Sequence, residues 1–306
     1  MNLSLRLAVY KGGEFWRECW NTIKENIDIF DCIYISFNYS ELQQQDIALI
    51  ENFNSDKIKW RKENRMLSAV EHGRNIDRFL KHCNVSGHVL ILCHDDLLVR
   101  EGLLKLKQLS LGHNEAAWLG ADFFTENGMP VPEVCRKDIV SDQKIPVEKF
   151  LCDLPQRALN VSRIVLPAEI YYLPQLPWAN IKYGYFAEVF YLCNSMIHNI
   201  QQLSATCVRI RMHSGSEGAL RITSLLLYDS LLAFGNCMLI FDQKQIHLVI
   251  ARHVGYMIKK NILSGIWNFF AVQKILMKSG HYKFTRMLKF IGYLFYTFLF
   301  RTGKEQ

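Results

Sequence analysis

The chain has 306 residues, half of them apolar, which is enough for one large domain with a substantial buried core. Its charged fraction of 21% excludes an intrinsically disordered protein, and its formal net charge of +7 is concentrated near the carboxyl end, which argues against general nucleic-acid binding. Lys11 and Glu14 interrupt the amino terminus too early for a secretory signal, and nine cysteines without a CxxC pair are typical of a reducing compartment. We therefore expect a cytoplasmic protein.

Apolar and periodic segments alternate along the first hundred residues. Strands are predicted at 3–10, 32–37, 58–60 and 89–93, and helices at 15–27, 42–53 and 68–83. This alternation is typical of an α/β fold with a doubly wound, mostly parallel sheet covered on both faces. Ligands of such sheets bind beyond the carboxyl ends of the strands, here just after Val9, Phe37 and Cys93.

The segment from about 126 to 177 contains all seven prolines of the chain, and we expect it to form loops that select the substrate. Beyond residue 214 the pattern is helical to the end. The sequence therefore predicts a sheet domain followed by a helical region.

The apolar strand at 89–93 leads directly into His94, Asp95 and Asp96. Carboxylates at a strand end are costly unless they are solvated or paired with a cation. Mg²⁺ and Mn²⁺ prefer oxygen ligands and bridge them to substrate phosphates. The alternative is that the two aspartates cap the helix that follows.

Five segments, taken in chain order, resemble those of a known family. They are Leu5 to Gly12 (LRLAVYKG), Gly73-Arg74-Asn75, His94-Asp95-Asp96, 184–188 (GYFAE) and 209–216 (RIRMHSGS). Together they resemble family 2 glycosyltransferases of the GT-A fold, of the type that builds bacterial O-antigen or capsular polysaccharide. The resemblance implies a GT-A (Rossmann-like) catalytic domain at 1–215 and a helical extension at 216–306.

The resemblance also implies a role for individual residues. The donor-binding residues would be Val9, Tyr10, Asn38, Arg74, Asn75, His94, Asp95 and Arg211. The metal, Mn²⁺ or Mg²⁺, would be held by Asp96 with help from Asp95 and His213, and Glu188 would be the catalytic base. The chain departs from the family pattern at His94, at Ala187 and at Asn38, where the family usually has an acidic residue.

Aromatic residues precede the expected base. Aromatic rings pack against sugar C–H surfaces, so Trp178 and Tyr185 are candidates for acceptor binding. Core packing is the alternative explanation for these rings. Glu188 could equally be a solvated acid at a helix start, His213 a loop histidine without a metal, and Arg74 a helix-surface arginine.

Residues 252–306 form the basic tail, in which ten Lys or Arg stand against one acid among many aromatic residues. Its longest uncharged stretch, 290–300, has eleven residues, well short of the ~20 that span a bilayer. Basic and aromatic helices of this kind favour the surface of an anionic membrane. Nucleic-acid binding and packing onto the body or a second subunit are the alternatives.

The resemblance implies an inverting, metal-dependent glycosyltransferase, and the basic tail predicts that it is peripheral on the inner membrane. It would move a hexose from a nucleotide-sugar, a UDP-sugar first of all, to a lipid-diphosphate-linked oligosaccharide. A nucleotidyltransferase is an alternative, although Lys11-Gly12-Gly13 is too short for its phosphate loop. A catalytically degenerate, membrane-bound scaffold of the same fold is another.

Overall fold

The computed structural model describes residues 1–53, 55–131, 141–152, 160–173, 191–192, 196–212 and 291–292. The chain divides into two compact units, of which the first contains 1–146, 157–176 and 196–216. The second contains 147–156, 177–195 and 217–306. The description below concerns the first unit, apart from helix α6 of the second.

The first ninety-three residues form four strands and three helices, as predicted. The strands are β1 (Leu3–Val9), β2 (Cys32–Phe37), β3 (Ile58–Lys62) and β4 (His88–Cys93), and the helices are α1 (Gly13–Glu25), α2 (Gln43–Glu51) and α3 (Ala69–His82). Every predicted end lies within two residues of the observed one. Hydrophobic periodicity predicts these elements well because each has one long apolar run or one apolar face.

The remaining described elements follow in order. They are β5 (Leu97–Leu98), α4 (Arg100–Gln108), β6 (Glu115–Thr125), β7 (Gln143–Pro146), α6 (Val147–Cys152), the 3-10 turn η2 (Val161–Arg163), β8 (Ile164–Pro167), the 3-10 turn η3 (Ala168–Tyr172) and β9 (Asn199–Met212). The expectation of loops at 126–177 is therefore wrong in part, because this stretch contains β7, α6 and β8. Its prolines mislead because Pro146 and Pro167 stand at strand ends, where proline is tolerated.

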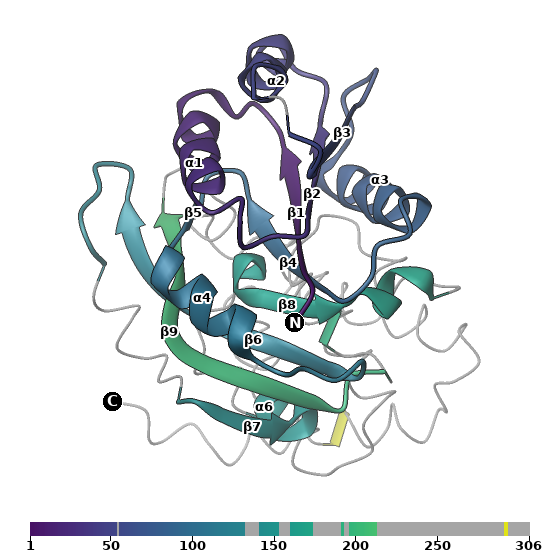
Figure 1. Cartoon of the computed structure of the whole chain (residues 1–306), viewed down its shortest axis with the longest axis vertical. Helices are drawn as coiled ribbons and strands as arrows, with labels where there is room; N and C mark the ends of the chain where they lie inside the picture. The colour runs from purple at the N-terminus through teal and green to yellow at the C-terminus, as the bar shows by residue number, and fades with distance from the viewer. Residues whose placement is uncertain are drawn as a thin grey trace. The chain divides into compact units, whose positions relative to one another are not determined.

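The described strands form one sheet in the order β3-β2-β1-β4-β8-β6-β9-β5, with β7 added on β9 (Figure 1). β3, β2, β1 and β4 are all parallel, and β6 and β9 are parallel to each other. β8 joins the two groups by antiparallel pairing with β4 and β6. The predicted fold class, a mostly parallel α/β sheet, is confirmed.

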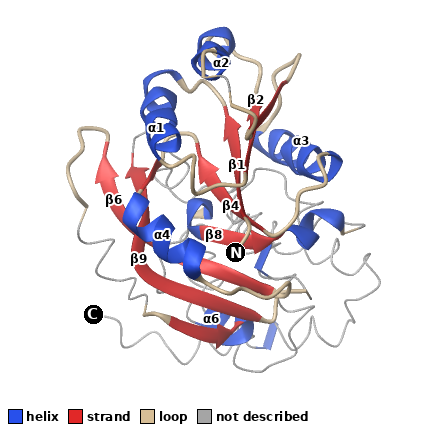
Figure 2. Cartoon of the chain, viewed as in Figure 1, coloured by secondary structure: helices blue, strands red, loops and turns tan. Residues whose placement is uncertain are grey.

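The sheet carries helices on both sides (Figure 2). One side of β1 presents Leu5 and Leu7 to the main apolar cluster, which includes Trp16 and Trp20 of α1. The centroids of the two indole rings lie 5.7 Å apart. They occupy positions i and i+4 of the helix, so both face the sheet. Among the described residues, no helix is both long and apolar enough to cross a membrane.

The other side of the sheet meets α3 through polar contacts. The Arg6 guanidinium of β1 donates to the Asp77 carboxylate at 2.7 Å and to the Gly73 carbonyl at 3.1 Å. His72 Nε2 lies 3.0 Å from Ser36 Oγ of β2. Burial, and after it the charge of Arg6, lowers the pKa of His72 to about 4.

Helix α4 lies directly against the backbone of β9 at Gly102. A Cβ atom placed there would overlap the backbone of Thr206 and Cys207. Only glycine fits this close approach of helix and strand.

We expect Gly102→Ala to destabilise the fold by about 1–3 kcal/mol, because the helix must move away from β9. Helix propensity alone would give the opposite sign, a gain of about 1 kcal/mol. Urea unfolding measures the change, and Gly112→Ala is the control because its added methyl group would meet only side-chain atoms at 3.3 Å or more. A stabilised Gly102→Ala variant would contradict the close contact.

A second prediction concerns acid stability. An unfolded histidine titrates near pH 6.5 and folded His72 near 4, so the unfolded chain binds the extra proton first and stability falls as the pH drops from 6.5 to 4. By pH 5 the loss from this residue is about 2 kcal/mol. Urea midpoints at pH 7.5 and 5 should show a smaller loss in His72→Gln than in the wild type. The exposed control His113→Gln should keep the full loss, and an equal loss in all three proteins would refute the assignment.

Candidate active site

The carboxyl ends of β2, β1 and β4 lie together at one edge of the sheet (Figure 1). Val9 pairs with Phe37, and Ala8 with Cys93. The residues that follow these strands were the predicted ligand-binding residues. The structure brings Tyr10, Asn38 and the 94–96 turn to this shared edge.

The loop after β1 is fixed by a carboxylate from α2. The amides of Gly12 and Gly13 donate to the two oxygens of Asp46, at 3.1 and 3.0 Å. Burial raises the pKa of Asp46. These amides at the start of α1 are thus engaged within the protein. They do not form an open phosphate loop, in agreement with the sequence argument against a nucleotidyltransferase.

Val9 and Tyr10, both predicted to bind the donor, lie at this edge but differ in exposure to solvent. Val9 is buried, and its carbonyl accepts from the amide of Asn38 at 2.8 Å. Tyr10 is 37% exposed, and its hydroxyl contacts Met66 Sδ at 3.4 Å. Tyr10 therefore offers an aromatic face beside the strand ends.

Asn38 holds the loop that precedes α3. Its Nδ2 donates to the Leu67 carbonyl at 2.8 Å, and its Oδ1 accepts from the amides of Leu67 and Tyr39, each at 3.0 Å. The side chain is buried. A direct role in donor binding was predicted for Asn38, whereas the observed contacts make it a support for the loop.

Arg74 and Asn75 lie on α3, both partly buried. Asn75 donates to Glu63 Oε2 at 3.2 Å, and the other Glu63 oxygen lies 3.1 Å from Arg61. The sequence analysis missed Glu63, a buried acid just after β3 at the same edge. An acidic residue three positions after the predicted strand at 58–60 was the available signal.

Asp96 is a buried carboxylate that joins three parts of the chain. Its Oδ2 accepts from Ser162 Oγ at 2.6 Å, and its Oδ1 accepts from the amide of Arg211 at 2.9 Å. It is 2% exposed. Burial, and next the charge of Asp95, raises its pKa well above the usual range. Ser162 has no sequence signal, because its contact with Asp96 spans 66 residues.

The helix-capping alternative for Asp95 and Asp96 is wrong. β5 follows the turn, and α4 begins at Arg100 with Val99 in the N-cap position and no side-chain cap. The two aspartates therefore belong to the turn after β4 and do not stabilise a helix end.

Arg211, at the end of β9, closes the turn from the other side. Its Nε donates to the Asp95 carbonyl at 3.0 Å, and its guanidinium pairs with Glu18 of α1. The guanidinium centre lies 4.5 Å from the Phe15 ring and 4.7 Å from the Phe124 ring. Arg211 was predicted to bind the donor. In the structure its side chain is 2% exposed and its hydrogen bonds hold the turn that contains Asp95 and Asp96.

Asp95 and His94 are partly buried, unlike Asp96. One carboxylate oxygen from each aspartate and the Cys93 sulfur lie within 4.8 Å of one another. Carboxylate oxygens suit a hard divalent cation, so these residues fit the predicted metal. Asp95 is the more accessible of the two carboxylates, and Asp96 stands behind it.

Several predicted residues lie outside the described part of the chain. These are Glu188, His213, Trp178 and Tyr185, together with the basic tail 252–306 except for residues 291–292. Their roles stay predictions.

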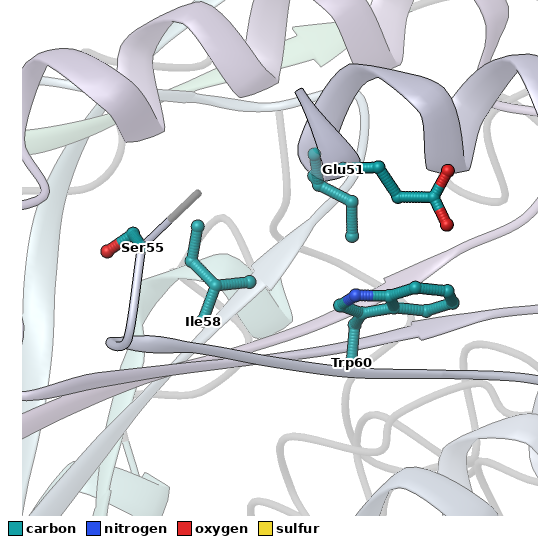
Figure 3. A pocket seen from close by; sticks show the side chains of 5 residues that line it. Glu51, Ser55, Ile58 and Trp60 are labelled. Carbon is teal, nitrogen blue, oxygen red and sulfur yellow. The ribbon is translucent and has the colours of Figure 1, made fainter. Parts of the chain in front are cut away.

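A hollow of about 240 Å³ lies elsewhere, lined by Ile50, Glu51, Ser55, Ile58 and Trp60 (Figure 3). Ile58 is the first residue of β3 and pairs with Ile33 near the start of β2. The hollow is therefore at the opposite end of these strands from the candidate site, and none of the predicted site residues lines it.

No protein-family profile and no curated protein sequence matches this chain. Solved structures do match. Residues 1–349 of S. aureus TarS in complex with UDP-GlcNAc are 13% identical, with a TM-score of 0.61 over 91% of this chain and 81% of that one. The same TarS segment in another crystal structure gives 13% identity and a TM-score of 0.58 over 85% and 73%.

GalNAc-T7, solved with UDP, GalNAc and Mn²⁺, is 10% identical, with a TM-score of 0.50 over 83% of this chain and 51% of that one. Both proteins are glycosyltransferases of the GT-A fold. At these identities the likeness establishes the architecture. The chain has the GT-A glycosyltransferase fold.

Proposed function

We propose that this protein is an inverting, metal-dependent glycosyltransferase that transfers a hexose from a UDP-sugar. One observation carries the proposal: the accessible Asp95 stands beside the buried, hydrogen-bonded Asp96 at the carboxyl end of β4 in a GT-A fold. Ligands of doubly wound sheets bind at this edge. The similar TarS structure contains UDP-GlcNAc, and the GalNAc-T7 structure contains UDP and Mn²⁺, which supports this choice of donor and cofactor.

The donor would lie along the ends of β1, β2 and β4. Tyr10 would offer its exposed ring to the base, and Arg74 on α3 would face the phosphate charge. Asp95 and Asp96 would hold a divalent cation, which when bound neutralises the diphosphate and improves it as a leaving group. Ser162 and Arg211 would keep Asp96 fixed through their hydrogen bonds.

The transfer step needs a base, and the sequence resemblance assigns it to Glu188. Glu188 would take the proton of the acceptor hydroxyl as that oxygen attacks the anomeric carbon from the side opposite the diphosphate. Inversion at this carbon follows from the single displacement. His213 would add positive charge near the leaving group, and Trp178 and Tyr185 would contact the acceptor.

The acceptor proposal rests on the tail. The excess of Lys and Arg at 252–306 and its aromatic residues suit the surface of an anionic membrane. A peripheral enzyme on the cytoplasmic face of the inner membrane would meet a lipid-diphosphate-linked oligosaccharide there. We therefore propose a role in O-antigen or capsule assembly.

Calorimetric titration with UDP tests the donor site. We expect UDP binding in the presence of Mn²⁺ that weakens at least about tenfold in Asp95→Asn, with a smaller change in the thermal midpoint than in Asp96→Asn because the Asp95 side chain is partly exposed. Asp96→Asn should lower both UDP affinity and stability, since its carboxylate is buried and accepts two hydrogen bonds.

Asp56→Ala, an exposed aspartate in the turn before β3, is the matched control and should bind UDP like the wild type. Absence of UDP binding with and without Mn²⁺ would refute the catalytic assignment. It would leave the degenerate scaffold as the better explanation.

The membrane proposal is tested by co-sedimentation of the full chain with lipid vesicles. We expect binding to vesicles with anionic lipid, little binding to neutral vesicles, and release as salt is raised. Each basic residue contributes about 1 kcal/mol of binding free energy near an anionic surface. The free energy of vesicle binding should therefore fall by several kcal/mol in the triple variant Lys283→Glu, Arg286→Glu, Lys289→Glu. Equal sedimentation with neutral and anionic vesicles would contradict an electrostatic anchor.

A further inference from the structure

Cys93 brings a sulfur atom to the aspartate pair. Its Sγ and one carboxylate oxygen each from Asp95 and Asp96 all lie within 4.8 Å of one another. In a four-coordinate site with bonds of about 2.0–2.3 Å, two ligand atoms lie about 3.3–3.8 Å apart. Rotation of the Cys93 and Asp95 side chains toward the fixed Asp96 carboxylate would bring the three ligand atoms to a single ion.

The backbone fixes where this sulfur can lie. The amide of Cys93 donates to Ser162 Oγ at 2.9 Å, and the same hydroxyl donates to Asp96 Oδ2 at 2.6 Å. The Cys93 carbonyl accepts from the amide of Asp96 at 3.2 Å. Ser162 thus holds Cys93 and Asp96 in one arrangement, and Arg211 holds Asp95 and Asp96 from the other side.

Cys93 also differs from its neighbours in β4. The five residues before it are buried, while Cys93 is partly exposed at the strand end where Asp95 is also accessible. Among the described free cysteines, Cys19 and Cys207 are buried, whereas Cys32 at the start of β2 and Cys83 at the end of α3 are partly exposed as Cys93 is. Core packing, the usual role of a free cysteine, does not require a thiol at this exposed strand end.

We propose that Cys93, Asp95 and Asp96 together form a metal site whose thiolate gives it a preference for borderline or soft divalent cations, such as Zn²⁺, Co²⁺ or Cd²⁺, over Mg²⁺. Sites with only oxygen ligands suit Mg²⁺ and Mn²⁺, whereas sulfur ligands favour the softer ions. On binding, the thiol releases its proton to solvent and the sulfur lone pair forms the bond to the cation. The inference rests on the proposal that this edge holds a divalent cation.

A Co²⁺ titration of the full, reduced, metal-free protein tests the sulfur directly. A cobalt–thiolate bond gives a charge-transfer absorption band in the near ultraviolet, which carboxylate ligands do not give. We expect a saturable band that Cys93→Ser abolishes, together with a loss of Co²⁺ affinity of at least about tenfold. Cys83→Ser is the matched control, because Cys83 is also free and partly buried but lies at the end of α3. A band that survives in Cys93→Ser would overturn the proposal.

Cys93→Asp provides a second variant, in which the site keeps three ligands and the readout is its preference between two cations. An all-carboxylate site should lower the ratio of Zn²⁺ to Mg²⁺ affinity, measured by calorimetry, by at least about tenfold. An unchanged ratio would count against a sulfur ligand even if Cys93→Ser failed to fold.

The two proposals fail in different ways. A cobalt band that depends on Cys93, with no UDP binding under any cation, would support the thiolate site and refute the proposed transferase. Mn²⁺-dependent UDP binding that is equal in the wild type and Cys93→Ser, with no cobalt band in either, would support the transferase and refute the thiolate site.

Discussion

The buried carboxylate of Asp96 is the contact on which the candidate site depends. It joins the turn after β4 to Ser162 of η2 and to the backbone of β9 at Arg211, three segments far apart in the sequence. A buried carboxylate is costly unless its oxygens are hydrogen bonded, and here both are. Loss of either donor would leave a lone pair unsatisfied in the core, so the fold holds this turn in one conformation. That fixed turn is what keeps Asp95 and Cys93 at the strand end.

Buried polar side chains also hold two other loops at this edge of the sheet. Asp46 fixes the loop after β1 through the amides of Gly12 and Gly13, and Asn38 fixes the loop before α3 through the backbone of Leu67. In each case one buried polar side chain from a neighbouring segment satisfies backbone groups that have no strand or helix partner. Buried polar contacts of this kind contribute little net stability, but they select one arrangement of the loop, because any other arrangement leaves them unpaired. The loops that would bind the donor are therefore ordered before it arrives.

Sequence reasoning located the strands and helices of the first ninety-three residues because local periodicity determines them. It also predicted that the chemistry lies at the strand end at His94, Asp95 and Asp96, and the structure places these residues together in one turn after β4. The sequence could not show which aspartate is buried, because Asp95 and Asp96 are adjacent and chemically identical. Only the contacts of Asp96 with Ser162 and Arg211 distinguish it from the more accessible Asp95. Arg211 and Asn38 were expected to touch the donor for the same reason: a polar residue at the right edge looks alike in sequence whether it binds a ligand or supports a loop. β8 was missed because its four residues, which end in proline, give too short a pattern.

A division of labour follows from these contacts. Side chains that reach back into the protein, among them Asp46, Asn38, Asp96 and Arg211, are buried and have their hydrogen bonds within the fold. Tyr10 is exposed and Asp95 partly exposed at the same edge, so both side chains can be reached by a ligand. Affinity then gains from preorganisation, because the ordering cost of the loops has already been met during folding. Substitutions in the supporting group should act on the shape of the whole edge, whereas substitutions at the accessible residues should act on one ligand contact each. Asn38 suits its supporting position because an amide both donates to and accepts from the backbone of Leu67, whereas a carboxylate could only accept.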